Sequence, residues 1–409
     1  MKCRHCDAVL GLPVVDLGSS PPSNAYITEQ ALHEVELWFP LRVMVCENCW
    51  LVQIVYLPDV DRFFNAEYAY FSSISKSWLA HSERYVTDMV DRFGLNTHSQ
   101  VVEVAANDGY LLQYFQKRHV PCLGIEPTAS TAAAARDRGV AIIEEFFNDS
   151  LARTLLSQGR QADLIVANNV LAHVPDINRF VSGFSILLKP SGVATFEFPH
   201  LLNLIRYNQF DTIYHEHSFY LSLLAVQRIF SQNGLAVFDV EEHSTHGGSL
   251  RVFAQRSDAQ HHLTQERVKK LLELEVQAGL NTPDYYLGFQ AKADRVKRDL
   301  IRFLLDVQAR GERVAAYGAA AKGNTLLNYS GVRSDLIPFV VDRSPLKQGK
   351  YLPGSRIPIV AEARIKVEKP DYILILPWNI KEEIMTQLSY IGAWGGRFVT
   401  AIPTLEITD

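Results

Sequence analysis

A chain of 409 residues is long enough for two or three domains, each of which can bury a core of its own. Its apolar share of 47% is ordinary for a globular protein, and a net charge of −5 without a long basic run argues against a nucleic-acid partner. The N-terminus shows no apolar signal region, and no stretch reaches the roughly 18 apolar residues of a membrane span, so we expect a cytoplasmic protein with no membrane partner.

Two cysteine pairs near the N-terminus predict a metal site. Cys3 and Cys6 form one Cys-x-x-Cys knuckle, and Cys46 and Cys49 form a second about forty residues later. Four thiolates complete a tetrahedral shell around Zn²⁺ and leave no position for water, so the expected role of the zinc is structural. A thiol redox pair is the alternative.

An aromatic, hydroxyl-rich segment over residues 68–73 follows, ahead of a helix expected from about Ser75 to Phe93. Tyr68 and Tyr70 in this segment could close over a ligand. An aromatic cluster that joins two domains would have the same composition, so both interpretations stay open.

From Gln100 to Gln255 strands and helices alternate, which predicts a doubly wound parallel sheet. The strand that begins at Val101 breaks into a polar turn at Asn107-Asp108-Gly109 before the next helix. Such a turn points backbone N–H groups and the positive end of a helix dipole at a ligand. Glu126, at the tip of the second strand, is placed to accept hydrogen bonds from two ribose hydroxyls. Together they predict a nucleoside site.

Both NAD and S-adenosylmethionine could use this nucleoside site. The turn lacks Gly-x-Gly-x-x-Gly and therefore has no glycine platform for a pyrophosphate, which favours the methyl donor. Phe146 and Phe147, after the third strand, could sandwich an adenine or belong to the core. Ligands of such sheets bind at the carboxyl ends of the strands, so we expect six polar side chains to converge there: Glu103, Asp108, Glu126, Asn168, Asn169 and His173.

The segment from Asp211 to Tyr220 holds the densest group of titratable side chains in the chain, with Tyr214, His215, Glu216 and His217 in a row. Buried groups of this kind cost desolvation energy and concentrate where protons move, so the segment predicts chemistry. Zinc at His215 and His217 is the weaker alternative, because a spacing of two suits a strand face and no third ligand is evident nearby.

The last third of the chain predicts a second lobe. A charged helical stretch from about His262 to Gln308 separates it from the middle of the chain. Just before that stretch, Arg251 could hold a phosphate or pair internally. In the second lobe a strand, a glycine-bearing turn and a helix follow one another, and Lys322 and Lys347 beside the turn would suit a diphosphate. Pure scaffolding is an equal alternative for this lobe.

The order of these motifs resembles the S-adenosylmethionine-dependent sugar C-methyltransferases, which act on nucleotide-linked 4-keto-6-deoxy sugars. The resemblance covers nearly the whole chain. It rests on Cys3-x-x-Cys6, Cys46-x-x-Cys49, Tyr68-x-Tyr70, Glu103-x-x-x-Asn107-Asp108-Gly109, Tyr214-x-Glu216-His217, His246-Gly247-Gly248-Ser249 and Tyr317-Gly318-Ala319-x-x-Lys322-Gly323-Asn324-Thr325. In the loop after Glu103, Ala105 and Ala106 stand where members often carry a glycine and a serine.

The resemblance implies a fold of three parts: a zinc-binding module over residues 1–66, a Rossmann-like domain that binds S-adenosylmethionine over 67–262, and a second Rossmann-like domain over 263–409 that contributes to sugar-nucleotide binding. It also implies that the enzyme, expected to be a monomer, methylates C-3 of a sugar linked to a nucleotide, which we expect to be dTDP. The C-3 proton lies beside the 4-keto group, so its removal gives an enolate, which requires one base and one carbonyl stabiliser but no metal.

The resemblance also assigns residues. His217 is expected to be the base, with Glu216 and Tyr214 orienting it or supporting the enolate oxygen and His173 assisting, and an imidazole near its ordinary pKa of about 6.5 suits that task. The cofactor is expected to contact Tyr68, Tyr70, Glu103, Asn107, Asp108, Gly109, Glu126, Phe146, Asn168 and Asn169. The sugar nucleotide is expected to contact His246, Gly247, Lys322, Asn324 and Lys347.

Two other functions remain open from the sequence. An O- or N-methyltransferase for a nucleotide sugar would need a base for a hydroxyl or an amine and would not depend on a 4-keto group. A zinc-ribbon binding or scaffold protein would keep the Rossmann-like lobes without turnover.

Overall fold

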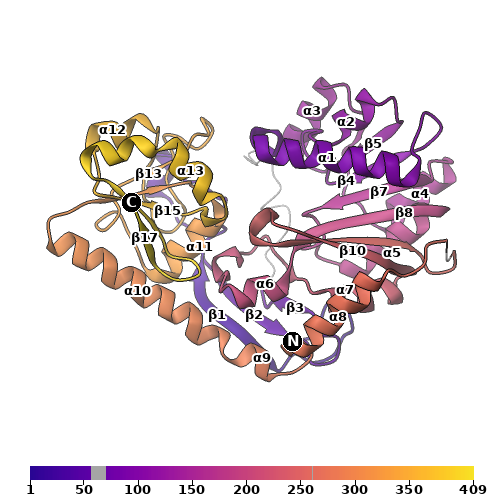
Figure 1. The fold of residues 1–409 in the computed structure, drawn as a ribbon, viewed down its shortest axis with the longest axis horizontal. Helices are drawn as coiled ribbons and strands as arrows, with labels where there is room; N and C mark the ends of the chain where they lie inside the picture. The colour runs from indigo at the N-terminus through magenta and orange to yellow at the C-terminus, as the bar shows by residue number, and fades with distance from the viewer. Residues whose placement is uncertain (57–70, 260) are drawn as a thin grey trace.

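The computed structural model describes residues 1–56, 71–259 and 261–409. Two lobes stand side by side over a small N-terminal sheet (Figure 1). In the described part of the chain, the strands form three sheets of four, seven and six strands. No helix in these ranges is both long and apolar enough to cross a membrane. Tyr68 and Tyr70, which the sequence places near the cofactor, lie outside the described residues.

The N-terminal sheet takes its last strand from the middle of the chain. Leu41, Val43 and Val45 are buried in its second strand, and exposed Arg42 lies between the first two, as expected for a sheet with one covered face. The last strand continues directly from the segment that holds His217. In order across the antiparallel sheet, the strands are β1 (Leu12–Ser20), β2 (Phe39–Val45), β3 (Val52–Ile54) and β9 (Phe219–Tyr220), with η1 (Gln30–His33) between the first two.

The seven-stranded sheet forms the centre of the larger lobe. Its spatial order is β10-β11-β8-β7-β4-β5-β6. The strands are β4 (Val101–Val104), β5 (Cys122–Ile125), β6 (Ile142–Ile143), β7 (Ala162–Asn168), β8 (Leu188–Pro199), β10 (Leu235–His243) and β11 (Ser249–Arg256). Its helical segments are η3 (Ser72–Ile74), α1 (Lys76–Phe93), α2 (Leu112–Lys117), α3 (Ala129–Asp137), α4 (Asp149–Ser157), α5 (Ile177–Leu187), α6 (Leu201–Arg206), η4 (Phe210–Thr212), α7 (Leu223–Gln232) and η5 (Thr245–Gly247).

The prediction of an all-parallel sheet is wrong for one described strand. β11 runs antiparallel to both of its neighbours, β8 and β10. The connection from β10 to β11 spans only residues 244–248, and a parallel crossover needs a dozen residues or more, so the chain turns back as a hairpin. This hairpin carries His246 to the carboxyl edge of the sheet.

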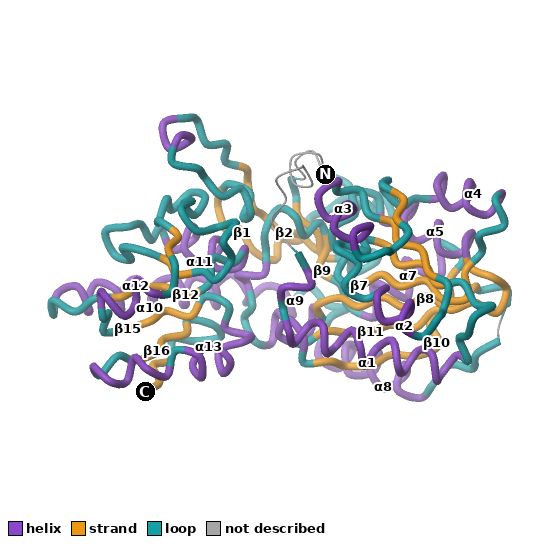
Figure 2. Tube along the Cα trace, turned by 90° about the horizontal axis from the view of Figure 1, so that it is seen from above, coloured by secondary structure: helices purple, strands orange, loops and turns teal. Residues whose placement is uncertain are grey.

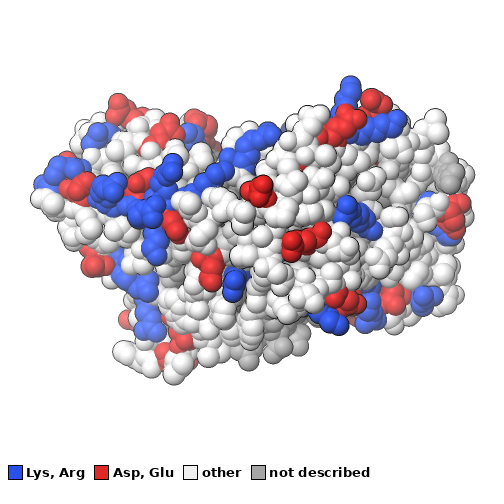
Figure 3. Space-filling model, turned by 90° about the horizontal axis from the view of Figure 1, so that it is seen from below, with Lys and Arg blue, Asp and Glu red and all other residues white. Residues whose placement is uncertain are grey.

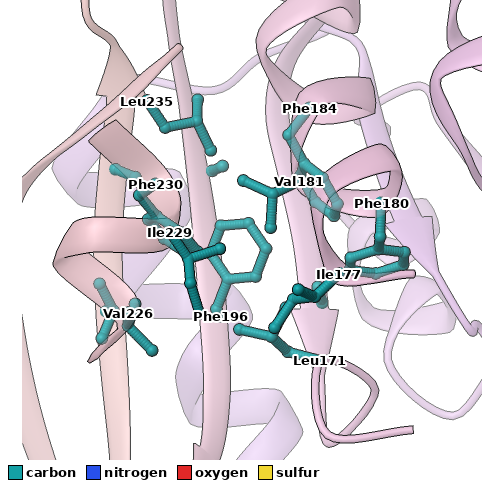
Figure 4. Close-up of a cluster of buried hydrophobic side chains, with 14 of the residues drawn as sticks. Leu171, Ile177, Phe180, Val181, Phe184, Phe196, Val226, Ile229, Phe230 and Leu235 are labelled. Atoms are coloured by element: carbon teal, nitrogen blue, oxygen red, sulfur yellow. The ribbon is translucent and has the colours of Figure 1, made fainter. Parts of the chain in front are cut away.

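Aromatic rings fill the space between the central sheet and the helices on one of its faces. Phe196 of β8 lies 4.6 Å, between ring centroids, from both Phe184 of α5 and Phe230 of α7. Figure 4 shows these side chains pointing toward one another between the two helices. Each of the three rings is fully buried. Burial of this kind is worth roughly 1.5–3 kcal/mol per side chain, so it fixes the helices on the sheet.

The six-stranded sheet forms the smaller lobe and is parallel except for its last strand. Its spatial order is β14-β13-β12-β15-β16-β17. The strands are β12 (Val314–Tyr317), β13 (Val340–Val341), β14 (Ile359–Val360), β15 (Tyr372–Ile375), β16 (Arg397–Thr400) and β17 (Glu406–Thr408). The remaining helical segments are α8 (Glu266–Ala278), α9 (Asp284–Leu287), α10 (Phe289–Ala309), α11 (Ala321–Ser330), α12 (Ala363–Glu368), η6 (Trp378–Ile380), α13 (Lys381–Gln387) and η7 (Ser389–Trp394).

The N-terminal sheet shares a core with the smaller lobe. Val14 and Leu17 of β1 belong to the same buried cluster as Ala293 of α10 and Leu327 of α11. Figure 2 shows β1 and β2 between the two lobes. The N-terminal segment is therefore part of the frame that positions the lobes.

On the face seen in Figure 3, acidic and basic side chains are interspersed.

Candidate active site

A cavity of about 620 Å³ lies where all three parts of the chain meet. That volume is within the range of pockets that bind small molecules and cofactors. The larger lobe contributes Asn107, Glu126 and His217 to its wall, the N-terminal segment contributes Asn24, and the smaller lobe contributes Lys322.

The turn after β4 and the tip of β5 hold a carboxylate ready for hydroxyl groups. The backbone N–H groups of Asn107 and Thr128 each donate to one oxygen of Glu126, both at 2.9 Å. Burial raises the pKa of Glu126, although the hydrogen bonds from Thr128 and Asn107 lower it in part. The carboxylate lines the cavity in a fixed orientation, which suits the two ribose hydroxyls of S-adenosylmethionine.

Two of the six polar side chains expected to converge do not reach the cavity. Glu103 is fully buried, and burial raises its pKa well above the usual range. Asp108 is also fully buried, accepts a hydrogen bond from Ser73 and lies 2.9 Å from the Arg138 guanidinium. The sequence could not show this, because a strand-end position does not fix the direction of a side chain. Asn168, Asn169 and His173 line the cavity with Glu126.

The two phenylalanines after β6 divide between surface and core. Phe146 is 47% exposed and lines the cavity. Phe147 is buried and packs against Phe180 and Phe184, with ring centroids 5.8 and 5.0 Å away. Both rings line the cavity, and Phe146 is the more exposed of the two and the one more accessible to an adenine. Gly109 (φ 76°) is not in the cavity wall, and a Cβ there would lie 3.0 Å from Val140.

A backbone carbonyl fixes the tautomer of His217. Its Nδ1 lies 2.9 Å from the carbonyl oxygen of Thr212, which can only accept, so Nδ1 carries the proton and Nε2 keeps its lone pair. The ring packs against Tyr214 at 3.9 Å and His173 at 4.8 Å between centroids. Burial, with the neighbouring His173, lowers the pKa of His217 well below its ordinary value. The expectation of an unperturbed pKa is thus wrong, and the imidazole is neutral at pH 7.

Glu216 is held by the N-terminal segment. Its two carboxylate oxygens accept hydrogen bonds from the Asn24 side-chain amide at 2.9 and 2.8 Å. Burial raises its pKa to about 7. Glu216 therefore forms part of the cavity wall, and the orientation of the imidazole expected from Glu216 comes instead from the Thr212 carbonyl. Sequence reasoning missed Thr212 because a backbone acceptor has no sequence signature.

The turn before β11 brings a further imidazole to the cavity. His246 adopts a positive φ of 53°, lines the cavity and lies 3.4 Å from the Asn169 amide nitrogen. Burial lowers its pKa to about 4. Gly247 packs on Trp378 and its carbonyl accepts from Gln209 at 2.8 Å, so it joins the lobes. Arg251 pairs internally, at 2.7 Å from Glu197 and 3.1 Å from Glu241, and is 2% exposed.

Two lysines of the smaller lobe face the cavity. Lys322 donates to the Asn379 side-chain oxygen at 2.6 Å, and its ammonium lies 4.6 Å from the Trp378 ring centroid. Lys347 donates to the Ala319 carbonyl at 2.8 Å. Asn324 is buried away from the cavity and donates to the Ser23 carbonyl at 2.6 Å, so the structure gives it a role in packing the N-terminal segment onto α11.

The four N-terminal cysteines form a second site. Their sulfurs all lie within 4.8 Å of one another, with Cys3–Cys49 at 3.6 Å and Cys6–Cys46 at 3.5 Å. A tetrahedral zinc with Zn–S bonds of about 2.3 Å needs sulfurs roughly 3.8 Å apart, so the arrangement fits the metal. Within the described ranges, neither His215 nor His217 belongs to a metal-binding group. His215 lies against the Phe39 and Pro40 carbonyls instead.

Three family models match the chain in succession: a zinc binding domain over residues 3–64, a methyltransferase domain over residues 78–240 and a C-methyltransferase C-terminal domain over residues 244–403. The chain is also similar to the C-methyltransferase NovU of Streptomyces niveus. The two are 36% identical over 402 residues, which is 98% of this chain and 95% of NovU.

Solved structures resemble less than half of the chain. The PH0226 protein of Pyrococcus horikoshii covers 46% of this chain and 95% of its own, at 15% identity and a TM-score of 0.38. Magnesium protoporphyrin IX methyltransferase of Synechocystis, with bound S-adenosylmethionine, covers 45% and 82%, at 15% identity and a TM-score of 0.35. With TM-scores below 0.5, these likenesses add nothing to the assignment.

Proposed function

The chain belongs to the family of S-adenosylmethionine-dependent C-methyltransferases, and we propose from that premise that it methylates C-3 of a nucleotide-linked 4-keto-6-deoxy sugar, with dTDP as the nucleotide. The observation that carries the proposal is His217 in the wall of the cavity, with Nδ1 donating to the Thr212 carbonyl so that Nε2 keeps its lone pair. A hydrogen on carbon is removed only by a base that is free to accept it, next to a group that can hold the resulting charge.

The cavity has a place for each part of the reaction. Glu126, Phe146 and the turn at Asn107 would hold the cofactor, which supplies an electrophilic methyl group when bound. Lys347 and the N-terminus of α11 lie at the opposite lobe and suit the diphosphate of the sugar nucleotide. His217 lies in the part of the cavity wall that the larger lobe contributes.

The proton balance follows from the tautomer of His217. Nε2 takes the C-3 proton, the C–H electron pair forms the C-3–C-4 double bond, and the carbonyl electrons move to oxygen as an enolate. C-3 of the enolate would then bond to the methyl carbon, the methyl–sulfur bond would break with its electron pair left on the departing thioether, and the carbonyl would re-form. Nε2 returns its proton to solvent, so no net charge stays in the site.

Methyl transfer to oxygen or nitrogen is the second candidate, because His217 could equally deprotonate a hydroxyl or an amine. Family membership favours carbon. The scaffold interpretation is set aside, since the chain is similar to a C-methyltransferase over 98% of its length.

The test is hydrogen exchange at C-3 in deuterated water without the methyl donor, followed by NMR of the product made with the donor. We expect C-3 deuteration of a 4-keto sugar nucleotide and a new methyl group on C-3. A sugar nucleotide with a hydroxyl at C-4 is the control and should not exchange. Methylation of oxygen or nitrogen without C-3 exchange would overturn the proposal.

A further inference from the structure

Lys322 presents an ammonium group to the cavity that lacks a close counter-ion. It is the second residue of α11, and its printed contacts are the neutral Asn379 oxygen at 2.6 Å and the face of Trp378 at 4.6 Å. The other cavity lysine differs: Lys347 lies 3.6 Å from the Asp342 carboxylate. An ammonium has three N–H donors, and Asn379 occupies one of them, so Lys322 can donate to a bound molecule.

The platform under Lys322 comes from both lobes. Trp378 donates from its indole nitrogen to Asp211 at 2.7 Å, and Asp211 is fully buried. The same indole packs on Gly247, where a Cβ would lie 2.5 Å from the ring. Asp211 supplies a negative charge in the neighbourhood of Lys322, which favours the ammonium form although burial lowers the pKa of the lysine. The position of the ammonium is therefore fixed against the larger lobe.

Lys322 also acts on the base through its charge. Burial is the main cause that lowers the pKa values of His217 and His246, and the positive charge of Lys322 lowers both further. All three side chains line the one cavity. A diphosphate bound at Lys322 would bring two negative charges into the cavity that His217 also lines.

Removal of a proton from C-3 creates negative charge on the neighbouring carbonyl oxygen. The imidazoles of His173, His217 and His246 are neutral, because burial lowers each of their pKa values. The charge on the oxygen therefore needs a partner other than these imidazoles. A fixed ammonium meets that need, since it is already oriented before the reaction and loses nothing by reorganising.

We propose that Lys322 is a catalytic residue: it donates to the carbonyl oxygen next to the reacting carbon and stabilises the enolate that forms when His217 takes the proton. The inference rests on the proposed C-methylation. Lys347 and the N-terminus of α11 then bind the diphosphate of the sugar nucleotide. Asp211 and Trp378 are positioning residues, which act by holding the ammonium.

The test measures C-3 exchange in deuterated water, without the methyl donor, at saturating 4-keto sugar nucleotide. Lys322→Met keeps the length of the side chain and removes its charge. We expect exchange to fall about 10²–10³-fold, as for loss of one oxyanion donor, with affinity for the sugar nucleotide changed only a few-fold. Lys347→Met is the contrasting variant and should raise the KM for the sugar nucleotide.

A second variant separates chemistry from folding. Lys322→Ala leaves room for a small amine, so added ethylammonium should restore part of the exchange, whereas tetramethylammonium, which has no N–H donor, should not. Lys322→Met with exchange at the parent rate and only a raised KM would make Lys322 a diphosphate ligand and overturn the inference. Absence of exchange in the parent enzyme would instead contradict the proposed function itself.

Discussion

The carbonyl of Thr212 determines which nitrogen of His217 can accept a proton, and burial keeps that nitrogen unprotonated. At the scale of single residues the site depends on such fixed acceptors and donors: Thr212 for the imidazole, Asn24 for Glu216, and the backbone N–H of Asn107 for Glu126. Each contact orients a titratable group before any ligand binds, which is what an enclosed polar site requires.

Glu126 should account for much of the affinity for the methyl donor. Two hydrogen bonds to a charged group are worth about 1.5–3 kcal/mol each, so Glu126→Ala should weaken binding of S-adenosylmethionine by roughly 10²–10⁴-fold. Calorimetry measures this directly. Glu144→Ala removes an exposed carboxylate after the next strand and is the matched control. Equal affinities in the parent and Glu126→Ala would remove Glu126 from the cofactor site.

Glu216 should make stability depend on pH. Burial raises its folded pKa to about 7 from the ordinary value of 4.5, so its contribution to stability is fully present below about pH 4.5 and is lost as pH rises toward 7. Glu216→Gln removes this loss. Relative to the parent, the variant should gain stability between pH 5 and pH 8, by up to about 3 kcal/mol. Urea unfolding at the two pH values is the measurement.

Glu29→Gln, at an exposed position of the N-terminal segment, is the control for Glu216 and should change stability equally at both pH values. A Glu216→Gln variant that follows the parent at every pH would mean that the carboxyl group is solvated and does not carry the burial cost.

Ala105 adopts a left-handed backbone conformation, with φ at 59°. This conformation costs a residue with a Cβ about 1–2 kcal/mol. We therefore expect Ala105→Gly to leave the free energy of unfolding unchanged or to raise it by up to about 1 kcal/mol. Thermal unfolding tests this against Ala133→Gly, an exposed position inside α3, which should cost about 1 kcal/mol. Equal losses in both variants would contradict strain at Ala105.

At the scale of elements, the strand β9 couples two sites. Its pairing with β3, at Val52–Tyr220, joins the N-terminal sheet to the segment from Asp211 to Tyr220, which holds His217. Val101–Val104, Cys122–Ile125 and Ala162–Asn168 were recognisable from their apolar runs. The two-residue β9 was not, because a strand of that length has no periodicity of its own. The pairing of the N-terminal sheet with the catalytic segment could therefore not be predicted from the sequence.

Zinc removal should consequently affect catalysis before cofactor binding. We expect one zinc per chain by metal analysis. Chelation should abolish C-3 exchange, because β9 loses its paired strand and His217 its position, while S-adenosylmethionine still binds at Glu126. Calorimetry and the exchange assay on the same apo sample measure both. An apo protein that exchanges at the parent rate, or a disulfide among the four cysteines, would contradict this coupling.

At the scale of the whole molecule, the N-terminal segment holds the two lobes around the cavity. Tyr26 donates to the Ala319 carbonyl of the smaller lobe at 2.6 Å, and Asn24 binds Glu216 of the larger lobe. Thr325 of α11 donates to the Ile213 carbonyl at 2.8 Å. The motifs around Glu126, His217 and Lys322 could be found in the sequence, but these cross-lobe contacts could not, because each joins an ordinary side chain to a distant partner.

The central claim is that this cavity forms a carbanion, with His217 as the base. The most direct measurement is the rate of C-3 hydrogen exchange in deuterated water for the parent enzyme and His217→Asn, with a 4-keto sugar nucleotide and no methyl donor. We expect both proteins to bind the sugar nucleotide, since the imidazole acts mainly in the transition state. Exchange and methylation should then fall together in His217→Asn by about 10²–10⁴-fold. A variant that loses methylation but exchanges C-3 hydrogen at the parent rate would contradict the assignment of His217 as the base.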